Sequence, residues 1–118
     1  MYQLFFWKYN EEIYLNHQEV SESLELQLDV EGLEELPIPV IINRVNTLFL
    51  NWERVDKDSW KNSEGKGAFQ VLTTSQSVRI DCYGTEGKTM DLLVSMMEEF
   101  KCPLYDPQVP ARYDEMNE

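Results

Sequence analysis

The sequence holds 118 residues, of which 42% are hydrophobic and 27% charged, and this length and composition predict one folded domain rather than a disordered chain. No apolar run approaches the roughly 20 residues of a membrane-spanning helix, and the aromatic N-terminus lacks the basic region and cleavage site of a signal peptide, so we expect a cytoplasmic protein without a membrane partner. A net charge of −12, from 22 acidic and 10 basic residues, repels nucleic acid and favours a basic protein as partner.

The first half of the chain predicts a strand followed by two helices. Residues 2–9 are rich in Phe, Trp and Tyr, which is typical of a strand. Asn16 with Glu19 three residues later resembles a capping box, and apolar residues follow at helical spacing. Residues 24–30 also alternate between apolar and polar side chains and fit a half-buried strand, but the cap and the Glu, Gln and Leu content favour a helix. Pro39 suits the first position of the second helix. The apolar stripes of the two helices are Val20, Leu24 and Leu28, then Ile41, Val45, Leu48 and Trp52.

The second half predicts two strands, a helix and a last short strand. Residues 53–67 read as a polar connector, and strands follow at 68–73 and 77–83. Thr85 is the expected cap of the next helix, and residues 102–105 form an edge strand because Pro is tolerated there. The last helix carries one apolar stripe, made of Met90, Leu93, Met97 and Phe100.

This order of elements predicts an α+β domain with the ferredoxin-like arrangement β-α-β-β-α-β. Right-handed crossovers then place both helical layers on one face of a four-stranded antiparallel sheet and leave the other face open. The single domain spans residues 1–118, with 108–118 as a frayed acidic tail. Residues expected on the open face are Phe5, Trp7 and Tyr9 of the first strand and Arg79, Asp81 and Tyr83 of the third.

The residues that could perform chemistry are few, so we expect no enzyme, no cofactor and no metal site. His17 is the one histidine, and no sequence spacing supplies it with a catalytic partner. Cys82 and Cys102 fall on strands that the first strand separates, which places them about 10 Å apart and predicts buried thiols rather than a disulfide.

Two surfaces are candidates for binding. The first is the acid-rich region 11–35, together with tyrosines and acids near the C-terminus, because aromatic rings and carboxylates suit a basic partner. The second is the open face of the sheet. The candidate residues are Glu19, Glu22, Glu25, Asp29, Glu34, Glu35, Tyr105 and Asp106 for the first surface and Trp7 and Tyr83 for the second.

In size, acidity and small number of cysteines, the whole chain resembles the immunity proteins of bacterial polymorphic toxin and contact-dependent growth inhibition systems. Such proteins neutralise a cognate toxin domain, often a nuclease, by occluding its basic active site. The resemblance implies a non-catalytic toxin inhibitor, and it assigns no binding residue because immunity families share neither one fold nor one motif. The alternative is a ferredoxin-like domain that binds a small ligand or forms a homodimer through its open sheet face.

Overall fold

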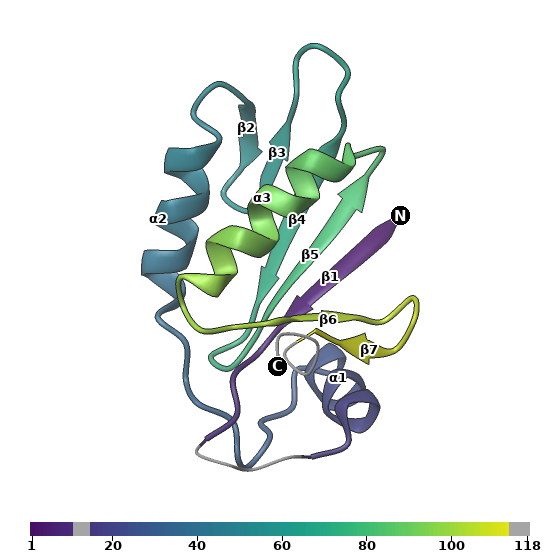
Figure 1. Cartoon of the computed structure of the whole chain (residues 1–118). Helices are drawn as coiled ribbons and strands as arrows, with labels where there is room; N and C mark the ends of the chain where they lie inside the picture. Colours follow the sequence, from purple (N-terminus) through teal and green to yellow (C-terminus); the bar gives the residue numbers. More distant parts are fainter. Residues whose placement is uncertain (11–14, 114–118) are drawn as a thin grey trace.

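The computed structural model describes residues 1–10 and 15–113, and it has a mixed α+β fold. Figure 1 shows α2 and α3 side by side over an antiparallel sheet, with α1 at one end near β6 and β7. Within the described ranges, no helix is both long enough and apolar enough to cross a bilayer. The elements follow in the order β1 (Tyr2–Phe6), α1 (His17–Glu25), α2 (Ile38–Leu48), β2 (Glu53–Asp56), β3 (Ser59–Lys61), β4 (Ala68–Thr73), β5 (Val78–Tyr83), α3 (Gly87–Glu98), β6 (Leu104–Asp106) and β7 (Ala111–Arg112).

Across the described residues, the sheet has seven strands in the order β2-β3-β4-β5-β1-β6-β7, and all neighbouring strands are antiparallel. The expectation of four strands is therefore wrong. The predicted connector 53–67 contains the hairpin of β2 and β3, and the predicted tail contains β7. The frayed tail is thus wrong for residues 108–113, whereas 114–118 lie outside the described residues.

The main core lies between the sheet and the pair α2 and α3. Alternate residues of the strands point towards these helices, as the predicted pattern of β5 requires. Ile41 and Val45 of α2 and Leu93 and Met97 of α3 are fully buried, so the central positions of both predicted helical stripes are confirmed. The strand residues of the main core are Leu4, Phe6, Trp60, Phe69, Val71, Val78, Ile80 and Cys82.

A second core lies on the opposite face of the sheet, where α1 packs against β1 and β6. The prediction that all helices share one face is wrong for α1, and the expected exposure of Trp7 and Tyr105 is wrong because both are fully buried. Burying the β1 side chains on both faces removes the large aromatic groups from water, at roughly 25 cal/mol per Å² of apolar surface. The second core consists of Phe5, Trp7, Val20, Leu24, Leu33 and Tyr105.

The segment after α1 is neither the helix nor the strand that its sequence suggested. The helix ends at Glu25, and Gln27 adopts a left-handed conformation with a φ of 59°. Val30 is then held by the Gln76 side chain, which accepts a hydrogen bond from its N–H and donates one to its carbonyl, both at 2.8 Å. Leu28, expected on the buried stripe, is 54% exposed.

The helix entries show one confirmed cap and one wrong one. The Asn16 side chain accepts a hydrogen bond from the Glu19 N–H at 3.0 Å, as predicted. The Thr85 hydroxyl donates instead to the Ala68 carbonyl at 2.8 Å, and it ties the entry of α3 to β4. The chain approaches closely there, because a Cβ on Gly67 would lie 2.6 Å from the Gly84 carbonyl oxygen.

Candidate protein-binding surface

The acidic α1 segment is the largest run of one charge sign in the described chain. Its helix buries Val20, Ser21 and Leu24 against the sheet, so the glutamates between them face water. No Lys or Arg occurs between Lys8 and Arg44. Excess negative potential therefore accumulates over this part of the surface. The segment comprises the exposed residues Glu19, Glu22, Glu25, Asp29, Glu31 and Glu35.

Glu34 differs from the other predicted acids because the chain itself supplies its partner. The Lys8 ammonium lies 2.9 Å from a Glu34 carboxylate oxygen, and the Glu34 N–H donates to the Lys8 carbonyl at 2.8 Å. Its charge is therefore largely compensated, and Glu34 is not part of the acidic α1 segment. Glu11 and Glu12 of the predicted acidic region lie outside the described residues.

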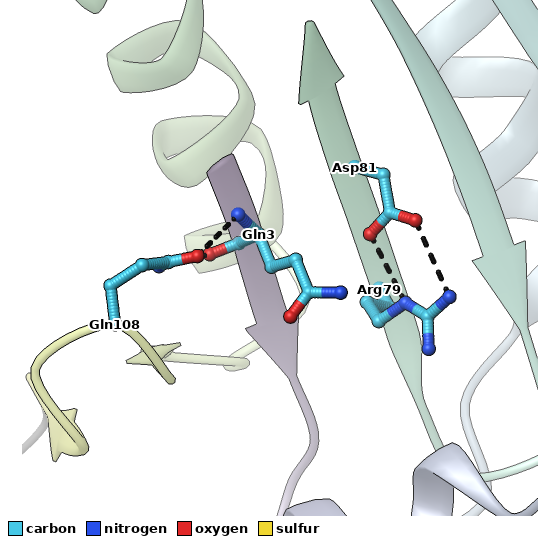
Figure 2. A network of polar contacts seen from close by, with 4 residues as sticks. All are labelled: Gln3, Arg79, Asp81 and Gln108. Carbon is cyan, nitrogen blue, oxygen red and sulfur yellow. Dashed lines mark hydrogen bonds and ion pairs between the residues drawn. The ribbon is translucent and has the colours of Figure 1, made fainter. Parts of the chain in front are cut away.

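The second face of the sheet remains open over β3, β4 and β5, away from α1. Tyr83 is 46% exposed there, as predicted, and borders a hollow of about 220 Å³ that also contacts Val55 and Lys61. Arg79 and Asp81 on β5 form a two-pronged ion pair, with nitrogen–oxygen distances of 3.1 and 3.3 Å (Figure 2). Asp81 is 5% exposed, so its expected place on an open surface is wrong, whereas Arg79 is partly exposed and Tyr83 is an exposed aromatic residue there.

Asp106, a predicted contact residue, is buried and holds the C-terminal strands to β1. Its carboxylate accepts hydrogen bonds from the Tyr2 hydroxyl, from the Gln108 side chain and, at 2.9 Å, from the Gln108 N–H. Figure 2 shows Gln108 beside Gln3. The Gln3 N–H donates to the Gln108 side-chain oxygen at 2.7 Å, and the Gln108 side-chain nitrogen donates to the Gln3 carbonyl at 2.9 Å. The hydrogen bond to Asp106, followed by the partial removal of the Tyr2 hydroxyl from water, raises the pKa of Tyr2 to about 12. The expected exposure of Asp106 is therefore wrong.

An aromatic cluster surrounds the Arg112 guanidinium beneath the N-terminus of α1. This group lies 4.4 Å from the Tyr9 ring and 5.4 Å from the Trp7 ring, and it donates to the Trp7 carbonyl at 2.8 Å. The Tyr9 hydroxyl is 2.7 Å from His17 Nδ1, and Tyr105 packs against Trp7 at 5.1 Å between ring centres. Arg112 was not predicted as a functional residue, because its partners Trp7 and Tyr9 lie about a hundred residues away in the chain and no local pattern indicates such a contact.

Both thiols are buried and free, as predicted. Cys82 lies on β5, but Cys102 precedes β6, which begins at Leu104, so its predicted place on a strand is wrong. Burial raises the pKa of Cys82 and of Cys102 to about 11. A thiol with such a pKa is almost wholly protonated at neutral pH, and it is a poor nucleophile. In the part of the chain that the structure describes, no group of three or more His, Cys, Asp or Glu side chains could hold a metal ion.

The comparisons with known proteins give no family for this chain. No family model matches the sequence. No curated protein resembles it at a significant level either. Within the described residues, the acidic α1 segment and the hollow beside Tyr83 are two surfaces that a partner could contact.

Proposed function

We propose that this protein is a non-catalytic inhibitor of the immunity type, which binds a basic toxin domain in the cytoplasm and blocks its active site. The observation that supports this most directly is the acidic α1 segment, whose exposed carboxylates have no basic residue near them in the sequence. A nuclease active site binds phosphates with Lys and Arg, so it presents the complementary charge. The carboxylates of this segment would compete with nucleic acid for those side chains.

The packing of α1 makes its charges a fixed target. Val20 and Leu24 are each 3% exposed and anchor the helix to the second core, so the carboxylates of Glu19, Glu22 and Glu25 are held on a packed helix. A preordered surface loses less entropy on binding than a flexible one. Opposite charges also accelerate the encounter, by up to several hundredfold at low salt.

We further propose that a ferredoxin-like unit forms the centre of this fold. The segments β1, α2, β4, β5, α3 and β6 follow the β-α-β-β-α-β order, and their strands are neighbours in the order β4-β5-β1-β6. In this interpretation α1, the hairpin of β2 and β3, and β7 are additions. The acidic α1 segment would then be an insertion between the first strand and the first helix of the unit.

The test of this function is co-expression in a bacterial host with the toxin domain encoded beside the gene for this chain. We expect the protein to restore growth, and the variant Glu22→Lys with Glu25→Lys to lose most of this protection. The matched control reverses two exposed acids on α3, Asp91→Lys with Glu98→Lys, and changes the net charge equally on the other side of the sheet. This control should still protect.

The same variants should separate in association kinetics with the purified toxin domain. Reversal on α1 should slow association at least tenfold at low salt, and the difference should shrink as salt shortens the Debye length from about 10 Å at 0.1 M to 3 Å at 1 M. If both charge reversals slowed association equally, the association rate would depend on the net charge of the protein and not on the acids of α1. Absence of any neighbouring toxin gene, or of growth protection, would contradict the proposal.

A second candidate function uses the hollow of about 220 Å³ beside Tyr83, which could take a small ligand or a side chain of a second copy. Self-association through this face must overcome the repulsion between two chains of net charge −12. Sedimentation equilibrium at low and high salt tests it, with Tyr83→Ser as the variant. A dimer that forms at high salt and is lost in the variant would favour this alternative.

A further inference from the structure

A groove of about 210 Å³ runs beside α1, between the helix and the returning chain at Val30. Leu15 and Val30 form apolar walls, and Val20 contributes to its floor. The Asn16 side chain at one end is already engaged, because it accepts the hydrogen bond that caps α1. The groove is lined by Leu15, Asn16, Glu19, Val20, Ser23 and Val30.

Glu19 is the one charged side chain of this lining, and its carboxylate is exposed. Among the described residues, no basic side chain pairs with it. The N-terminus of α1 lies close by and carries roughly half a positive charge. The buried Arg112 guanidinium lies beneath the same terminus but does not line the groove, whereas Glu19 lines it and Glu22, one turn later, adds exposed negative charge. The groove therefore combines apolar walls with a negative rim.

We propose that this groove binds one Lys or Arg side chain of the basic partner. The aliphatic stem would lie along Val20 and Val30, and the cationic head would reach Glu19. Long basic side chains bury their methylene groups against apolar surface while the charge stays near water, which matches this division. The inference rests on the proposed function, because it names the contact that the acidic α1 segment makes with its partner.

The test is an NMR titration of the whole protein, with labelled methyl groups, by N-acetylated hexalysine amide. We expect the largest chemical-shift changes at the methyl groups of Leu15, Val20 and Val30. Hexaglutamate, which carries the opposite charge, should not change the shifts of these methyl groups. Glu19→Gln should weaken binding about two- to fivefold, the range of an exposed ion pair. Glu98→Gln on α3 makes the same charge change elsewhere and should leave the affinity unchanged.

A filling variant separates the groove from simple acidity. Ser23→Met adds volume inside the groove without changing the charge, and it should abolish the methyl shifts while the backbone spectrum stays folded. Shifts that spread evenly over the acidic surface, or that survive Ser23→Met, would overturn the groove as the site. If the groove fails in this way while the toxin is still neutralised through α1, the proposed function stands. Hexalysine binding in the groove without toxin neutralisation would reject that function instead.

Discussion

Leu24→Ala tests whether α1 belongs to the folded core of the protein. Leu24 is 3% exposed and contacts the second core, so truncation removes buried apolar surface and leaves a cavity. Buried Leu to Ala changes cost about 2–5 kcal/mol. A pocket of about 90 Å³ already borders Leu24 and Phe5, so the neighbours have some room to relax and we expect the lower half of this range, about 2–3 kcal/mol.

The assay is urea unfolding followed by far-ultraviolet circular dichroism, with the free energy of unfolding taken from the linear extrapolation. Leu26→Ala is the matched control: it is the same substitution two residues later, at a side chain that is 73% exposed. We expect this control to change stability by less than about 0.5 kcal/mol. Equal effects of the two substitutions would refute the packing of α1 on this face of the sheet.

Three further predictions concern the turns, the thiols and the N-terminal tyrosine. Gly67→Ala should cost about 1–3 kcal/mol in thermal unfolding, because φ is +104° and the new Cβ meets backbone atoms, whereas Gly65→Ala, at φ +77° with open space, should cost less. Cys82 and Cys102 should resist iodoacetamide at pH 8 in the native protein and react fully in urea. Since their folded pKa of about 11 lies above the ordinary thiol value of 9.0, the free energy of unfolding should be highest below pH 9 and fall as the pH rises towards 11. Tyr2→Phe removes a donor to a buried carboxylate and should lower the free energy of unfolding by about 1–2 kcal/mol, and no loss in urea unfolding would contradict that bond.

The elements with a strong local pattern were predictable. Strands β4 and β5 lie where alternation and turn residues placed them, and the apolar stripe of α3 follows the helical period. The hairpin of β2 and β3 was missed because every residue of β2 is exposed and Trp60 alone faces the core. Strand β7 is two residues long and exists through its pairing with β6, which no local signal shows.

The placement of α1 could have been predicted from the first strand. Leu4, Phe5, Phe6 and Trp7 are consecutive and all buried, and an unbroken apolar run indicates a strand covered on both faces. An open face beside Phe5 and Trp7 was inconsistent with that run. For the candidate site, the charge of α1 was readable from composition, whereas the groove near Glu19 depends on the return of the chain at Val30, which is held by a contact far away in sequence.

The position of β1 in the sheet also determines when the protein can be completed during synthesis. Tyr2 pairs with Cys82, and Phe5 pairs with Tyr105, so the first strand to leave the ribosome waits for partners made much later. At 5–20 residues per second, the wait for β5 alone is roughly 4–16 s. The strands β2 to β5 are consecutive neighbours and can assemble meanwhile. During that interval the aromatic strand β1 has no partner strand, so its apolar side chains stay exposed to water until β5 is made.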